Sequence, residues 1–182
     1  MSEEPPTKKT KTGWENHKLN CNRAVMKADE GKHLAELAKA PITTMQGIGE
    51  VHAKVLDHLG IKTVEQLAKY KYFLMARGLK TLAEVEVKDG RVPDSVMNVD
   101  HAIDKEDESK SFVEMIESPI RVIEGLTKDA EDLFKHLGVK TVGDLADFKY
   151  CRWAEAIVEL AKYEESLDEI EARKARELKK LG

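Results

Sequence analysis

The sequence predicts an all-α protein built from two tandem copies of one multi-helix unit. Residues 20–86 align with residues 98–164 at a constant offset of 78 without a gap, and about a third of the aligned positions are identical. Apolar residues recur at helical spacing, and no segment alternates as a half-buried strand does. The composition, with 41% hydrophobic, 5% aromatic and 35% charged residues, is typical of a helical protein. Self-similarity at a fixed period indicates two copies of one fold.

The alignment also sets the expected domain boundaries. We expect a disordered basic tail over residues 1–13, a first helical unit over 14–89, a second over 90–166, and a charged C-terminal helical extension over 167–182. Units of this size are close to the lower limit for an independent hydrophobic core. The two copies are therefore expected to pack against each other.

Each unit is expected to start with two short helices. Apolar residues at helical spacing predict the first one, with Val96, Val99 and Ile103 in copy two and Leu19, Cys21, Ala24 and Val25 in copy one. The second should cover residues 33–39 or 112–117. Pro41 and Pro119 end it, because the residue before a proline is pushed out of the helical region.

A glycine-containing turn then opens a helix of about nine residues in each copy. Gly60 and Gly138 stand where a left-handed residue closes such a helix, each followed by an apolar residue that can fold back on the last turn. Thr63 and Thr141 can cap the next helix, and Gln66 completes a capping box in copy one only.

A longer helix is expected to close each unit, over residues 70–86 in copy one and from residue 148 onward in copy two. In copy two it is expected to continue through Leu167 and Ile170 into the charged tail. Glu169 and Arg173, four residues apart, would support it there.

The segment from Met45 to Leu67 resembles a helix-hairpin-helix motif of the kind found in DNA repair and recombination proteins. The resemblance covers about 25 residues of each copy and rests on Gly47-Ile48-Gly49, Ala53, Leu56, Gly60, Thr63 and Leu67. In that family the glycine hairpin presents backbone N–H groups to a nucleic-acid phosphate, and the next helix adds its positive N-terminus. The resemblance implies that Gly47, Ile48 and Gly49 are the phosphate-contacting loop of copy one.

The sequence departs from that motif in its charges. Glu50 directly follows the first hairpin, and the nearest basic groups are Lys54 and His52. In copy two Thr127 replaces the second glycine, and Glu124, Asp129, Glu131 and Asp132 surround Lys128. Carboxylates this close oppose a phosphate, since nucleic-acid affinity comes mostly from neutralising backbone charge. The glycines therefore have two interpretations, a phosphate loop or a tight turn between packed helices.

The formal net charge of -4 is unevenly distributed. Residues 88–117 carry 4 basic and 9 acidic groups, and residues 118–165 carry 7 and 10, so no broad cationic face is predicted. The dense basic cluster Lys8, Lys9 and Lys11 is either a nuclear-import or phosphate-seeking tail or a solvated end. Neither a membrane span nor a secretory signal is recognisable, which predicts a cytoplasmic or nuclear location.

No catalytic residue, metal site or cofactor site is predicted, because nothing converges on a chemical step. Cys21 and Cys151 align with apolar residues, which favours core packing over a disulfide or a metal. His58 and His136 recur near a helix end, where an imidazole favours the negative end of the dipole. The recurring Tyr72 and Tyr150 are either a base-stacking platform or core aromatics.

These patterns favour a non-enzymatic binding or scaffolding module that engages another macromolecule, first of all a protein. Trp14, beside the polar tail, is the predicted partner contact, with burial against the first helix as the alternative. The second function is nucleic-acid backbone binding. Its candidate residues are Gly47, Ile48, Gly49, Lys54, Lys8, Lys9 and Lys11. The oligomeric state is left open.

Overall fold

The protein is all-α in the computed structural model, which describes residues 12–182; Lys8, Lys9, Lys11 and most of the predicted tail lie outside them. No strand forms among the described residues, and the predicted fold class is confirmed there. The α-helices are α1 (Leu34–Lys39), α2 (Glu50–His58), α3 (Val64–Ala68), α4 (Lys71–Ala83), α5 (Phe112–Glu117), α6 (Lys128–His136), α7 (Val142–Ala146), α8 (Lys149–Ala161) and α9 (Leu167–Leu181). Short 3-10 turns are η1 (Lys27–Asp29), η2 (Ile42–Thr44), η3 (Lys105–Asp107) and η4 (Ile120–Val122).

Two similar helical halves make up most of the fold. Helices α1 to α4 recur as α5 to α8 with equal lengths at an offset of 78 residues. The isolated backbone bridges recur as well: Val25 with Met45 matches Ile103 with Ile123, and Pro41 with Thr63 matches Pro119 with Thr141. The same local interactions therefore fix the chain path in both halves.

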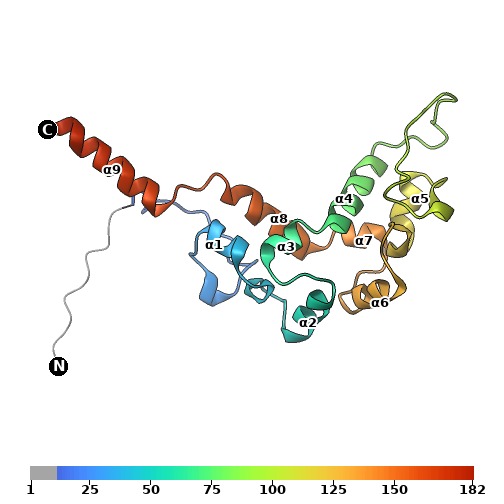
Figure 1. Cartoon of the computed structure of the whole chain (residues 1–182), viewed down its shortest axis with the longest axis horizontal. Coiled ribbons are helices and arrows are strands. Elements are labelled where there is room, and N and C mark those ends of the chain that lie inside the picture. Colours follow the sequence, from blue (N-terminus) through green and yellow to red (C-terminus); the bar gives the residue numbers. More distant parts are fainter. Residues whose placement is uncertain (1–11) are drawn as a thin grey trace.

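The long helices are exchanged between the halves (Figure 1). Helix α4 packs against α5 and α7 of the second half, and α8 packs against α1 and α3 of the first. Phe73 and Ala76 of α4, and Cys151 and Ala154 of α8, are almost fully buried by this exchange. Buried apolar side chains of both halves belong to one cluster. The predicted unit boundaries at 14–89 and 90–166 stay a prediction, but the hydrophobic core spans both units.

Two carboxylates complete the exchange at the helix ends. Glu86, just after α4, accepts hydrogen bonds from the N–H groups of Phe112 (2.8 Å) and Val113 (3.0 Å) at the start of α5. Glu164, just after α8, accepts equivalent bonds from Leu34 (2.6 Å) and Ala35 (3.0 Å) at the start of α1. Each carboxylate satisfies two N–H groups that a helix start leaves without partners and meets the positive end of the dipole.

The predicted helix ends are largely confirmed. Gly60 and Gly138 have φ of 82° and 77°. Each stands after a nine-residue helix, with one leucine between the last helical residue and the glycine. Thr63 and Gln66 form the predicted capping box. The expectation that copy one alone has this box was wrong, because Asp144 serves in the same way for Thr141.

Two helix predictions were wrong. The segments holding Val25 and Ile103 form no first helix. Their backbones bridge to Met45 and Ile123 instead, and both side chains are buried in the hydrophobic core. The last helix is not continuous either: α8 ends at Ala161, and Ser166 starts α9 with its own capping box. The interruption has a physical reason, since the turn between them brings Glu164 to the start of α1.

Loss of the Glu86 charge should destabilise the fold in a pH-dependent way. Partial burial raises the pKa of Glu86, but hydrogen bonds from the Val113 and Phe112 amides outweigh burial and hold the pKa below its ordinary value. Glu86→Gln should therefore cost about 1 kcal/mol of unfolding free energy near neutral pH. The difference from wild type should vanish as pH falls through the lowered pKa of the folded state, because the carboxyl is then protonated in both states.

Urea unfolding at about pH 7 and about pH 3 measures this effect. Glu164→Gln should show a similar loss at neutral pH, whereas Glu84→Gln, at an exposed carboxylate of the same helix end, should show none. Equal stability of the Glu86 and Glu84 variants would contradict the role of the carboxylate cap.

Candidate functional site

The two glycine hairpins lie on the same side of the molecule. Residues 45–49 lead into α2 and residues 123–127 lead into α6, and these two helices contact each other (Figure 1). Buried Ile48 and Leu126 anchor the hairpins to the core. The hairpins are therefore a paired surface feature that is anchored in the core.

The first glycine of each hairpin makes room for a tyrosine of the other half. A Cβ on Gly47 would overlap the Tyr150 hydroxyl, and a Cβ on Gly125 would lie 2.6 Å from the Tyr72 hydroxyl. Both glycines also have positive φ, 99° and 93°. Gly47 and Gly125 thus recur for packing between the halves, which supports the tight-turn interpretation of these two residues.

The start of α2 is open to solvent. Gly49 is its N-cap and supplies no side-chain cap, so within residues 12–182 the first N–H groups of the helix have no protein acceptor. Glu50 and Lys54 are exposed, and so is Val51, at 73%. An incoming phosphate would meet one carboxylate and one apolar side chain at this helix start before it reached Lys54.

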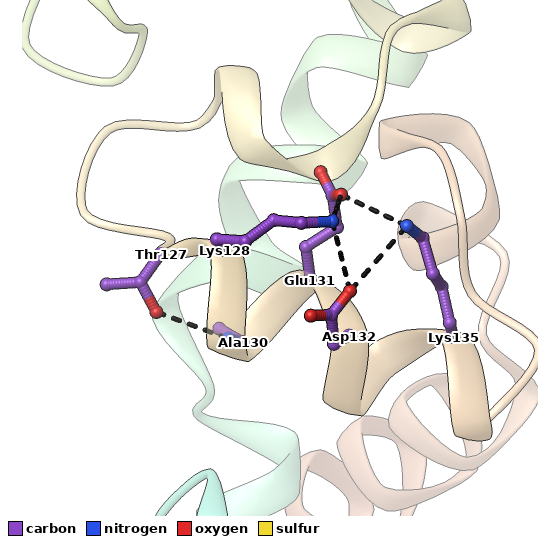
Figure 2. A network of polar contacts seen from close by, with 6 residues as sticks. All are labelled: Thr127, Lys128, Ala130, Glu131, Asp132 and Lys135. Atoms are coloured by element: carbon purple, nitrogen blue, oxygen red, sulfur yellow. Dashed lines mark hydrogen bonds and ion pairs between the residues drawn. The ribbon is translucent and has the colours of Figure 1, made fainter.

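The start of α6 has a different chemistry (Figure 2). The Thr127 hydroxyl accepts from the Ala130 N–H at 3.2 Å, so this helix end is already capped. Lys128 Nζ contacts Glu131 (3.0 Å) and Asp132 (3.1 Å), and Lys135 Nζ contacts Glu131 (3.1 Å). The two lysines are neutralised within their own helix.

The charges of this network stabilise one another. Hydrogen bonds from Lys128 and then Lys135 lower the pKa of Glu131, and contact with Lys128 lowers the pKa of Asp132. Contact with Glu131 and then Asp132 raises the pKa of Lys128. Glu131 is buried, and the equivalent residue of α2 is Ala53. The second hairpin therefore offers little positive charge to a phosphate.

The other sequence candidates are dispersed. Trp14 is half-buried, donates from its indole N–H to Glu165 at 3.2 Å and packs edge-on against His33; its role as a partner contact stays a prediction. His58 Nδ1 lies 2.7 Å from the Lys54 carbonyl oxygen in the last turn of α2. Cys151 is buried, and Cys21 is half-buried.

A groove that the sequence analysis missed lies between α1, α3 and α8. Its volume is ≈ 380 Å³, and its floor is apolar, formed by Ala35 and Ala38 of α1, Ala68 of α3, and Val158 and Ala161 of α8. Charged side chains line its rim: Lys39, Glu65, Lys69, Glu155, Glu159 and Lys162. We call this feature the α1–α3–α8 groove.

The matching place in the other half has larger side chains. At the positions of Ala35 and Ala38, the other half has Val113 and Ile116. At the positions of Val158 and Lys69 it has Lys80 and Asp147, and these two residues form an ion pair. Gly143 takes the position of Glu65, and a Cβ there would lie 3.1 Å from the Ile116 carbonyl oxygen. Comparing the two copies for alanine against a larger aliphatic residue could have found the groove from sequence.

No protein-family model, curated protein or solved structure matches this chain. Within residues 12–182, no three or more His, Cys, Asp and Glu side chains are grouped to hold a metal ion. In the same part of the chain, none of the helices combines the length and the apolar character needed to cross a membrane.

The Gly47–Tyr150 contact can be tested with a second glycine as a control. Gly60 has similar positive φ, but a Cβ there would meet nothing within 4 Å. Gly60→Ala should cost about 1–2 kcal/mol through backbone strain. Gly47→Ala should cost about 1–3 kcal/mol more, because Phe148 and Trp153 pack edge-on against the Tyr150 ring and limit its movement.

Tyr150→Phe removes the hydroxyl and should remove most of that excess from Gly47→Ala while leaving the cost of Gly60→Ala unchanged. Chemical denaturation of the wild type, the three single variants and the two double variants with Tyr150→Phe gives the coupling energy directly. Additive effects of Gly47→Ala and Tyr150→Phe would show that the contact does not hold the hairpin.

Proposed function

We propose that this protein is a non-enzymatic binding or scaffolding module for another protein, built from two tandem helix-hairpin-helix-like units. The single observation that carries the proposal is the α1–α3–α8 groove, an apolar surface whose counterpart in the other half carries larger side chains. An apolar depression rimmed by charges is a common form of protein docking site. A cytoplasmic or nuclear location belongs to the same proposal.

The counterpart suggests the chemistry of the occupant. In the second half, Val113 and Ile116 supply the branched aliphatic groups that Ala35 and Ala38 lack. A partner segment with one or two branched aliphatic side chains would fill the same space. Lys39 is exposed and lies near Glu65, whose carboxylate is already paired with Lys69 at 2.6 Å. A carboxylate beside the aliphatic group of the partner would therefore suit the rim.

Charge at the hairpins supports a protein partner over a nucleic acid. The lysines of α6 are paired with Glu131 and Asp132, and the start of α2 exposes Glu50 and Val51. Few cations could be released from a nucleic-acid backbone on this surface, and such release supplies most of the affinity.

The groove can be filled with residues that the chain itself uses at the equivalent positions. Ala35→Val combined with Ala38→Ile should abolish partner capture. Ala38 is 8% exposed and belongs to the core, so Ala35→Val alone, at the exposed residue of the pair, is measured beside it and should reduce capture without a change in thermal stability. Nuclease-treated native extract passed over the immobilised full chain, followed by mass spectrometry of the retained proteins, measures capture.

The matched control is Ala156→Ile, which adds a branched side chain at an exposed position of α8 outside the groove lining. This variant should retain every protein that the wild type retains. A set of captured proteins that is the same for the filled and the control variants would overturn the groove as the docking site.

Nucleic-acid backbone binding is the second candidate, favoured by the uncapped N–H groups at the start of α2. It would use the Gly47 to Gly49 amides, Lys54, and Lys8, Lys9 and Lys11 of the tail. Any such binding should be weaker than micromolar at physiological salt and should fade further as salt rises.

Duplex and single-strand titrations at two salt concentrations test this alternative, with the full chain, a version without residues 1–13, and Gly49→Asp. Gly49 has ordinary φ and open space around it, so the substitution adds charge without backbone strain. Sub-micromolar binding that survives loss of the tail but is abolished by Gly49→Asp would replace the protein-binding proposal.

A further inference from the structure

Helix α9 carries an apolar stripe that the chain covers only at its beginning. Leu167, Ile170, Leu178 and Leu181 fall on one side of the helix at helical spacing. Ile170 is 1% exposed and anchors the helix, whereas Leu178 and Leu181 are 69% and 86% exposed. Figure 1 shows α9 leading away from the body at one end of the longest axis. Its last two turns are an unpartnered apolar face.

The same end of the helix is strongly basic. Residues 173–182 hold 5 basic groups and 1 acidic group. Arg173 pairs with Glu165 at 2.9 Å, but no carboxylate among the described residues pairs with Lys179 or Lys180. A basic amphipathic helix of this kind fits an acidic surface that also offers apolar contacts.

The opposite end of the molecule has that complementary chemistry. Residues 94–108, which begin in the loop after α4, hold 6 acidic groups and 1 basic group, and Arg91 donates hydrogen bonds to the carbonyl groups of Ser95 and Met97 in this segment. Val96 and Met97 in this segment are 88% and 62% exposed. Asp104 lies beside Glu124, and its hydrogen bond and charge raise the pKa of Glu124. Glu108 also raises the pKa of Glu124, so these three carboxylates lie together, and Val96 and Met97 belong to the segment that leads to them. We call these five residues the acidic end.

We propose that the distal half of α9 docks on the acidic end of a second copy of this chain, so that the protein associates head to tail. Leu178 and Leu181 would contact Val96 and Met97, while Lys179 and Lys180 would face Asp104, Glu108 and Glu124. The two surfaces belong to opposite ends of the longest axis (Figure 1), so one molecule cannot close the contact on itself. A second copy supplies both the charge and the apolar area that each end lacks.

The contact is heterologous, since each copy uses a different surface on each side. Such contacts form rings when the rotation closes and open chains when it does not. Exposed charges contribute much of the attraction. Association should therefore weaken strongly at high ionic strength, because salt screens the charges and shortens the range of their attraction.

Sedimentation velocity of the full chain at low and high salt tests the proposal. At low salt the weight-average mass should rise with concentration to roughly twice the monomer mass of 20.5 kDa or beyond, and it should return toward the monomer at high salt. Lys179→Glu with Lys180→Glu, and separately Asp104→Lys with Glu108→Lys, should each leave a monomer at low salt. Leu178→Ser with Leu181→Ser should do the same at either salt concentration.

A mixing experiment separates head-to-tail contact from every symmetric dimer. Equal amounts of the Leu178→Ser/Leu181→Ser and Asp104→Lys/Glu108→Lys variants retain one intact surface of each kind. Together they should form a complex that stops at two chains, because the remaining tail lacks its leucines and the remaining end has gained lysines. A single chain that carries Lys179→Glu, Lys180→Glu, Asp104→Lys and Glu108→Lys has both charges reversed and should associate again.

Several outcomes would overturn the inference: a monomer at all concentrations in low salt, association that none of the variants weakens, or a mixture that stays monomeric. Far-UV circular dichroism of each variant excludes unfolding as the cause of a loss. The groove-filling variant Ala35→Val/Ala38→Ile should self-associate like the wild type, so failure of this contact and failure of the proposed groove function give different results.

Discussion

The exchange of α4 and α8 between the halves is the interaction on which the rest of the structure depends. Each long helix leaves the half that precedes it in sequence and fills the core of the other, placing Phe73 beside the second half and Cys151 beside the first. Tyr72 and Tyr150 then reach the opposite hairpins, and Glu86 and Glu164 cap the opposite short helices. The hairpins, the groove and the root of α9 owe their positions to these contacts.

Similar backbones carry different surface chemistry in the two halves. At the second hairpin, Thr127 caps the start of α6, and Lys128 and Lys135 are paired with Glu131. At the first hairpin, Gly49 has no side chain to cap the start of α2. Alanines 35 and 38 leave a groove where Val113 and Ile116 stand in the other half. Differences of this kind do not disturb the core, because they affect side chains at its edge. They give one half surfaces that its counterpart lacks.

Local signals in the sequence predicted the helix ends well, because one or two residues determine them. Gly60, Gly138 and the Thr63 box needed only backbone geometry and a nearby side chain. The exchange of α4 and α8 could not be predicted, since an apolar face such as that of Phe73 packs equally well within its own copy or across copies. Tyr150 and Gly47 each have an identical residue in the other copy. The contact between them joins residues far apart in the sequence, and helical periodicity does not predict such a contact. For the candidate site, the acidity of the second hairpin was readable from composition, whereas the groove required knowing which helices meet.

The loop after α4 does not cross from one half of the molecule to the other. Residues 85–97 join α4 to the second half, against which α4 already packs, so the chain passes between halves earlier, before residue 71. The exposed loop at Gly90 is therefore a connection within one spatial body. A protease that cut there would produce two fragments, each containing the long helix that completes the other's core. The fragments would stay interlocked, and a cleaved molecule would keep the shape of the intact one.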